Sequence, residues 1–337
     1  MKRAIIALSA SLLFSLNSHS ISHSVENGII VSNDENAVYL NDGSPNAFLY
    51  KPQIAFTSAH SHEQWGEGEL VLTTSSGRKV KVEKLLISPG YRDRVFTPKD
   101  ISEGKAIASR LSDFAVLILS EPIPMTKPVE LLKPEQVEEV IRNSEPVYSI
   151  GYSYFDSSRT RDGRGRQLQA KMISKDSANE IYKKYYENYH PNWGPKGASF
   201  ELIDVQITHT ATDGSGCDGD SGSGYFIKRS DTKIYIGPGG AHSVGVPNCG
   251  KPGYFGEYGN AFAIEPVYKH LDLIREAEAI VLEMTKKIEL EKAAIAKAQS
   301  EAKKSKKTVI TCQKGKLKKK ITAINPKCPK GYSKVKG

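Results

Sequence analysis

Short apolar runs separated by turn residues fill the chain from about residue 25 to 265, and this pattern constrains the fold more than any other feature. Most of the 28 Gly and 17 Pro of the 337-residue chain fall in this part. Runs of three to five residues rich in Val, Ile, Leu, Phe and Tyr, bounded by turn residues, are typical of β-strands. The nine runs begin at Ala37, Ala47, Ile54, Leu70, Ala115, Val147, Phe200, Tyr225 and Ile234. Together they predict an all-β, antiparallel protein built of barrels or sandwiches.

A different pattern begins after Glu265-Pro266, because positions 267 to 307 contain neither Gly nor Pro. This stretch predicts a helix of up to 41 residues, roughly 60 Å long. One set of its residues follows the 3-4 spacing of a coiled-coil seam: Ile274, Ala277, Val281, Met284, Ile288, Glu291, Ile295, Ala298 and Ala302. Because Glu291 interrupts the seam and alanines dominate its end, a solvated stalk or a helix lying on the body is favoured over an oligomeric coiled coil.

The chain begins with the layout of a secretory signal peptide. Lys2 and Arg3 precede a stretch of 13 largely apolar residues, 4–16, and small residues follow at Ser18, Ser20, Ser22 and Ser24. We therefore predict a signal peptide over residues 1–24; a buried N-terminal helix is the alternative. The apolar stretch is shorter than the roughly 18 to 20 residues that cross a bilayer, so no transmembrane segment is expected. Export predicts a secreted, extracellular protein in which the cysteines form disulfides. Association with the cell surface and retention in the periplasm are the alternative locations.

The C-terminal tail carries most of the positive charge. Residues 302–337 contain thirteen Lys and no Asp or Glu, which leaves a net charge of −4 on the other 301 residues of a chain whose total is +9. A mildly acidic body argues against a specific nucleic-acid partner. The tail itself is either a solvated charge run or an attachment to a polyanion, such as an anionic cell-surface polymer, lipid head groups or nucleic acid.

Two cysteines lie within this Lys-rich tail, around two β-prone runs that meet at Gly315. Cys312 and Cys328 enclose 15 residues, and a bridge across them would stabilise the tail by about 3 kcal/mol on the chain-entropy model. No further Cys or His lies nearby, which argues against a metal site. We therefore expect a small disulfide-closed tail over residues 307–337.

Three patches in the body carry side chains that could perform chemistry, in the order His, Asp, Ser. His60 ends the run Phe-Thr-Ser-Ala-His, and Asp113 precedes the most apolar run of the body. Ser221 lies in the segment Cys-Asp-Gly-Asp-Ser-Gly, whose glycines allow a tight turn with outward N–H groups. Taken singly, each patch has a plain interpretation: an exposed histidine, a residue leading a strand, and a turn.

Together the three patches resemble the signatures of the chymotrypsin/trypsin family of serine proteases, Thr-Ala-Ala-His, Asp-Ile-Ala-Leu-Leu and Gly-Asp-Ser-Gly. The resemblance extends from about Val25 to Leu273. It implies a chymotrypsin-like double barrel, two six-stranded antiparallel β-barrels, in a protease domain over residues 25–272. A long C-terminal helix over 266–306 and the small basic disulfide tail would follow. The implied activity is that of a secreted serine endopeptidase acting on protein or peptide substrates, with no cofactor and no metal.

The resemblance also assigns roles to the three side chains. Ser221 would be the nucleophile, His60 the general base and then acid, and Asp113 the carboxylate that orients the imidazole. The backbone N–H groups of Gly219 and Ser221 would form the oxyanion hole. His62, Ser215 and Ser223 lie near these residues in sequence but lack the flanking residues of the family motifs.

The family pattern further implies a substrate pocket. Ser215, six residues before the nucleophile, would form its floor, and Asp218 would lie at its rim. The residues implied in lining it or aligning substrate are Ser243, Val244, Gly245 and Gly253, and the implied bridge in its wall joins Cys217 to Cys249. An uncharged floor predicts a preference for a bulky apolar or aromatic residue before the cut bond, although Asp218 could still attract a basic one.

Activation in this family pairs a newly exposed N-terminal amine with the Asp before the nucleophile, which is Asp220 here. Signal cleavage after Ser24 would release Val25 directly, so that no separate zymogen cleavage is needed; cleavage after Ser20 is the competing expectation.

The sequence also departs from the family pattern. Ser61 replaces the Cys that usually follows the histidine, and Gly222-Ser-Gly replaces Gly-Gly-Pro.

Two rival functions are a catalytically silent, protease-like binding module and a surface-anchored protein that uses its basic tail. The presence of all three catalytic side chains favours the enzyme.

Overall fold

The computed structural model describes residues 28–32, 34–41, 45–64, 68–91, 112–152, 163–189, 205–209, 220–244 and 261–335. The predicted signal peptide lies outside the described residues. The chain divides into two compact units, residues 1–277 and 278–337. None of the helices in the described ranges has a segment long and apolar enough to span a membrane.

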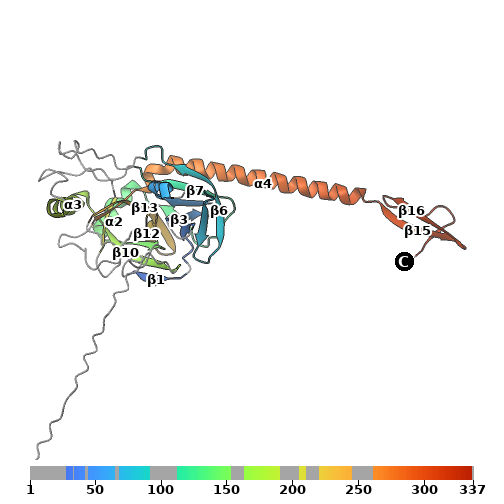
Figure 1. Ribbon diagram of the computed structural model, residues 1–337, viewed down its shortest axis with the longest axis horizontal. Helices are drawn as coiled ribbons and strands as arrows, with labels where there is room; N and C mark the ends of the chain where they lie inside the picture. Colours follow the sequence, from blue (N-terminus) through green and yellow to red (C-terminus); the bar gives the residue numbers. More distant parts are fainter. Residues whose placement is uncertain are drawn as a thin grey trace, which may run out of the picture. The chain divides into compact units, whose positions relative to one another are not determined.

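The first six strands after the N-terminal edge strand close into a barrel (Figure 1). In barrel order they are β2 (Ala37–Leu40), β3 (Asn46–Lys51), β4 (Ile54–Thr57), β7 (Ala115–Leu119), β6 (Lys79–Ile87) and β5 (Val71–Thr74). All neighbouring pairs are antiparallel. The barrel core consists of Val38, Leu40, Ala47, Leu49, Ala55, Leu72, Val80, Val82, Leu117, Leu119 and Ile123. All five side chains of β7 are buried, as its unbroken apolar run predicts.

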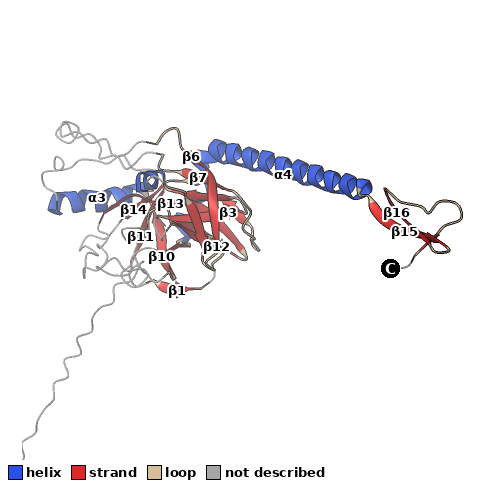
Figure 2. Cartoon of the chain, turned by 45° about the vertical axis from the view of Figure 1, so that its right-hand side comes forward, coloured by secondary structure: helices blue, strands red, loops and turns tan. Residues whose placement is uncertain are grey.

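A second ring of six antiparallel strands follows in the same unit. Its order is β9 (Pro146–Gly151), β10 (Gly165–Ile173), β11 (Val205–His209), β14 (Ala261–Ile264), β13 (Thr232–Val244) and β12 (Gly224–Arg229), and β12 pairs with β9 to close it. Two short strands lie outside the ring: β1 (Ile29–Val31) pairs with β10, and β8 (Val129–Leu131) runs parallel to β13. The predicted pair of six-stranded antiparallel barrels is confirmed, and Figure 2 draws the strands in red.

Aromatic side chains join the two barrels. The ring of Tyr235, on β13, stacks on Phe48 of β3 with 4.6 Å between centroids and lies 5.2 Å from Phe56 of β4. All three side chains are almost completely buried. Strand β4 leads to His60, and β13 contains Ser243 and Val244. This aromatic contact therefore positions the two halves of the candidate site relative to each other.

Short helices connect the strands of the first unit. The 3₁₀ turns are η1 (Ala59–Gln64), η2 (Pro134–Gln136) and η3 (Val267–His270), and the α-helices before the C-terminal one are α2 (Val137–Asn143) and α3 (Lys175–Tyr189). Ala178 and Tyr182 of α3, one helical turn apart, are buried and anchor this otherwise polar helix to the second barrel.

The long C-terminal helix is also confirmed. Helix α4 (Leu271–Ser305) has 35 residues and starts directly after η3, so the first positions of the predicted 41-residue stretch form a 3₁₀ turn instead. Leu273, Ile274 and Ala277 are buried, but no described side chain of α4 beyond Ala277 is. The start of the helix therefore packs within the first unit, and its remainder belongs to the second unit.

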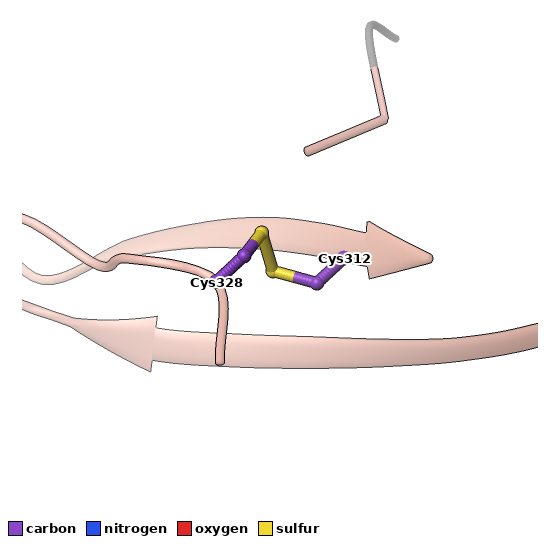
Figure 3. The surroundings of a disulfide bond; sticks show 2 residues. All are labelled: Cys312 and Cys328. Carbon is purple, nitrogen blue, oxygen red and sulfur yellow. A yellow bond between two sulfur atoms is a disulfide. The ribbon is translucent and has the colours of Figure 1, made fainter. Parts of the chain in front are cut away.

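The tail forms a small antiparallel sheet from the two β-prone runs and a third short strand. Strands β15 (Thr308–Lys314) and β16 (Leu317–Ala323) form a hairpin around Gly315, and β17 (Ser333–Lys334) pairs with the other edge of β15. Gly315 has φ +56°, a left-handed conformation that suits a tight hairpin turn. Cys312 and Cys328 form the predicted disulfide, with 5.6 Å between their Cα atoms (Figure 3).

Candidate active site

Strand pairing in the first barrel brings His60 and Asp113 together. Thr57, the last residue of β4, is opposite Ala115, the first residue of β7, so the residues just beyond these two strand ends are neighbours. His60 Nδ1 lies 2.7 Å from Asp113 Oδ2, and the backbone N–H of His60 donates to Asp113 Oδ1 at 2.8 Å. The two side chains are 4% and 1% exposed. The carboxylate therefore fixes both the position of the histidine backbone and the orientation of its ring.

The histidine loop is braced by a hydrogen bond between two serines. Ser58 Oγ and Ser61 Oγ are 2.6 Å apart, and the Ser61 N–H donates to the Ser58 carbonyl at 3.3 Å. Both residues are completely buried. Ser61 stands where the family pattern has a cysteine, so this local bond holds the loop at the position where a disulfide would otherwise do so.

Ser221 is held against the first barrel from the other side of the site. The Asn46 N–H, on β3, donates to the Ser221 carbonyl at 2.9 Å. The next residue, Gly222, has φ +82°, and a Cβ there would lie 2.2 Å from both Asn46 O and Thr57 Oγ1. The glycine after Ser221 is thus required by contact between this turn and strands β3 and β4, and not only by the turn itself.

Gly240, on β13, lies close to both the His60 imidazole and the Ser221 hydroxyl. A Cβ on Gly240 would lie 3.1 Å from His60 Cε1 and 3.2 Å from Ser221 Oγ. Its φ of +109° is also a conformation that favours glycine. Among the described residues no hydrogen bond joins Ser221 Oγ to His60. The evidence that the two side chains lie close together is their short distance to this common Cβ position. The sequence analysis missed Gly240, although a glycine pair inside a strand signals close approach of another group.

Two residues near the motifs, His62 and Ser223, are kept from a catalytic role by a local contact and by burial, respectively. His62 Nδ1 lies 2.6 Å from the Ala59 carbonyl, and the His62 ring meets the edge of Tyr91. Ser223 is 2% exposed, so its hydroxyl is withdrawn from solvent. These placements agree with the distinction that the flanking motifs predicted.

Asp220, directly before Ser221, is buried. Burial, and secondly the charge of Asp220, raise the pKa of Tyr225 well above its usual range. This phenol therefore stays neutral beside the carboxylate at physiological pH.

Several residues implied in the pocket, the oxyanion hole and activation lie outside the described residues: Val25, Ser215, Cys217, Asp218, Gly219, Gly245, Cys249 and Gly253. For Ser243 and Val244 only the backbone is described; they extend β13 opposite Phe262 and Ala261 of β14. No group of three potential metal ligands occurs in the part of the chain that the structure covers.

A second buried histidine–carboxylate pair lies behind the first. His270 Nε2, in η3, is 2.9 Å from Glu265 Oε1, and both side chains are buried. The His270 ring stacks on Phe114 with 4.5 Å between centroids and 1° between ring planes. Because Phe114 follows Asp113 directly, this pair supports the strand end that carries the carboxylate. The sequence analysis did not identify either residue.

Replacing His270 by Ala is expected to lower the free energy of unfolding by about 3 kcal/mol or more, because Glu265 would stay buried without its partner and Phe114 would lose a stacked ring. Chemical denaturation of the variant measures this loss. In a Glu265→Ala background the same substitution should cost much less. A loss below about 1 kcal/mol in the wild-type background would contradict the pairing.

The comparison with known families agrees with this geometry. A sequence model described as Trypsin matches residues 36–267, more than half of the chain, which includes both barrels up to the start of η3. The chain therefore belongs to the trypsin family of chymotrypsin-like serine proteases. A search of curated proteins finds no match to it.

Proposed function

We propose that this trypsin-family chain is a secreted serine endopeptidase that uses His60, Asp113 and Ser221 as its catalytic triad. The observation that carries the proposal is the buried His60–Asp113 pair, with His60 Cε1 and Ser221 Oγ both within 3.2 Å of one point, the position that a Cβ on Gly240 would take. A serine, an imidazole and a carboxylate from three separate elements in this arrangement are what acyl transfer requires.

In the proposed reaction, Ser221 Oγ attacks the carbonyl carbon of the cut peptide bond while His60 Nε2 takes the hydroxyl proton. Asp113 Oδ2 accepts the hydrogen bond of His60 Nδ1–H and stabilises the resulting imidazolium. The same proton passes to the leaving amine, which departs as the C–N bond breaks and the acyl-enzyme forms. Water then attacks the acyl group with His60 again acting as base, releasing the acid and restoring Ser221.

Three further parts of the proposal come from the family pattern. The N–H groups of Gly219 and Ser221 stabilise the oxyanion, an uncharged Ser215 floor selects a bulky apolar residue, and the amine of Val25 pairs with Asp220 after signal cleavage. The position of Asp220 supports the last of these, because it lies directly before Ser221 and is buried, as the family pattern requires of the carboxylate in this ion pair.

One labelling experiment tests the proposal. The mature, folded protein is treated with a serine-directed phosphonate and digested, and the labelled peptide is identified by mass. We expect one label per chain, on Ser221 and not on Ser223, and no label after denaturation, because only the folded triad activates the hydroxyl. Absence of labelling, or equal labelling of the denatured chain, would overturn the triad. The same peptide map reads the mature N-terminus, and a start at Ile21 would exclude activation by Val25.

A further inference from the structure

The second unit presents many cations and has very little core. Among its described residues after α4, only Ile310 and Cys312 are buried. Every described lysine from Lys306 to Lys334 is exposed: Lys306, Lys307, Lys314, Lys316, Lys318, Lys319, Lys320, Lys327, Lys330 and Lys334. Because residues 302–337 contain no Asp or Glu, the tail has no carboxylate side chain of its own to neutralise them.

The strand register distributes these charges over both faces of the sheet. Lys319 and Lys334 are each opposite Cys312 on neighbouring strands, so the three residues share one face. Lys318 and Lys320 are opposite Gln313 and Thr311 and therefore point to the other face. Lysines two residues apart on one strand are about 7 Å apart, and those two strands apart are about 10 Å apart.

The disulfide and the three-stranded pairing hold this array in place. Cys328 fixes the connection between β16 and β17 to the centre of β15. A folded scaffold with so small a core and so many unneutralised cations is costly in self-repulsion, and an anionic ligand removes that cost. A preformed array also loses less conformational entropy on binding than a disordered lysine tail would.

We propose that the unit formed by β15, β16 and β17 binds a linear polyanion that carries no bases, such as an anionic polymer of the cell surface. Residues 302–337 contain no Arg, Phe or Trp and a single Tyr, so they lack the bidentate and stacking groups with which nucleic acids are usually recognised. Leu317 shares its face with Ile310 and Ile321, but Ile310 is buried and the same face carries Lys319 and Lys334, so the hairpin presents no purely apolar face to insert into a bilayer. Lysines on both faces suit a flexible chain that wraps around the sheet.

This inference does not depend on the proposed peptidase activity. Its test uses the full chain with the disulfide intact and long-chain inorganic polyphosphate as the probe. The hairpin variant carries Lys318→Gln, Lys319→Gln and Lys320→Gln. The matched control carries Lys286→Gln, Lys287→Gln and Lys292→Gln, an equal change of charge on exposed positions of α4.

We expect salt-sensitive binding by the wild type, and an increase in the dissociation constant of about fivefold per hairpin lysine, of the order of 100-fold for three, at low salt. The control variant should change it by less than about threefold, and Ser221→Ala should leave it unchanged. Mass spectrometry checks that each variant keeps the Cys312–Cys328 bridge. No binding by the wild type, or equal weakening in both triple variants, would overturn the site. Tighter binding to a single-stranded oligonucleotide or to anionic vesicles than to polyphosphate would overturn the choice of partner.

Discussion

Replacing Ser221 by Ala is expected to lower kcat for peptide hydrolysis by about 10⁶-fold, because it removes the hydroxyl that His60 would activate for attack. The nearest candidate in sequence, Ser223, is withdrawn into the protein. The measurement is steady-state hydrolysis of a peptide substrate selected from a library by the wild-type enzyme. KM should change much less than kcat, since the substrate pocket is untouched.

Ser223→Ala is the matched control for this variant. It also removes a serine hydroxyl, two residues away, whose buried oxygen has no hydrogen-bond partner among the described residues. Its loss should leave kcat within a few-fold of the wild type and should not lower stability, because an unpaired buried hydroxyl costs free energy. If Ser221→Ala kept more than about 1% of wild-type activity, the assignment of the nucleophile would be wrong.

The barrel strands differ in how well the sequence predicts them. The apolar runs starting at Ala37, Ile54 and Ala115 coincide with β2, β4 and β7, because their side chains are nearly all buried. Strand β6 was missed because Lys and Glu alternate with Val on it: Val80 and Val82 face the core, whereas the charged residues beside them, Lys79, Lys81 and Glu83, are exposed. Strand β10 hides its inward Leu168, Ala170 and Met172 in the same way. A search for contiguous apolar runs detects strands that are covered on both faces and overlooks half-exposed ones.

The candidate site shows a similar limit. The motifs predicted His60 and Asp113, which the structure joins across 53 residues of sequence. They could not predict the groups that hold the motifs together, because those contacts come from elsewhere in the chain. Asn46 is an example: its N–H binds the Ser221 carbonyl, its carbonyl accepts from Thr57 Oγ1, and its side-chain oxygen accepts from the Tyr152 N–H. Nothing in the local sequence of Asn46 indicates these three bonds, since each depends on tertiary packing.

At the histidine loop, hydrogen bonds take the place of the disulfide that the family pattern has there. Ser61 cannot form the disulfide of the family pattern, but the Ser58–Ser61 bond and the bond from the His60 N–H to Asp113 restrain the loop at two positions. The restraint from Asp113 matters more for function, because it uses one oxygen of the carboxylate that also orients the imidazole.

The two oxygens of Asp113 make different hydrogen bonds to His60, and this difference predicts a large effect of Asp113→Asn. Since Oδ1 accepts the backbone N–H of His60, the oxygen of an asparagine side chain is expected to take this position, which turns the NH₂ group toward His60 Nδ1. Nδ1 must then accept a hydrogen bond, and the proton of the neutral ring moves to Nε2, where it prevents His60 from acting as a base toward Ser221. We expect kcat to fall by about 10⁴-fold with little change in KM.

A fall in kcat reports on the tautomer of His60 only if the Asp113→Asn variant remains folded. The asparagine is nearly isosteric with the aspartate and keeps the bond to the His60 N–H, so the thermal midpoint should fall by only a few degrees. Asp231→Asn, at a carboxylate that is 94% exposed, removes the same charge from the surface and should leave kcat unchanged. A loss of less than about tenfold in Asp113→Asn would mean that the tautomer of His60 is set by another group. A comparable loss in Asp231→Asn would mean that overall charge, and not the orientation of the imidazole, determines the rate.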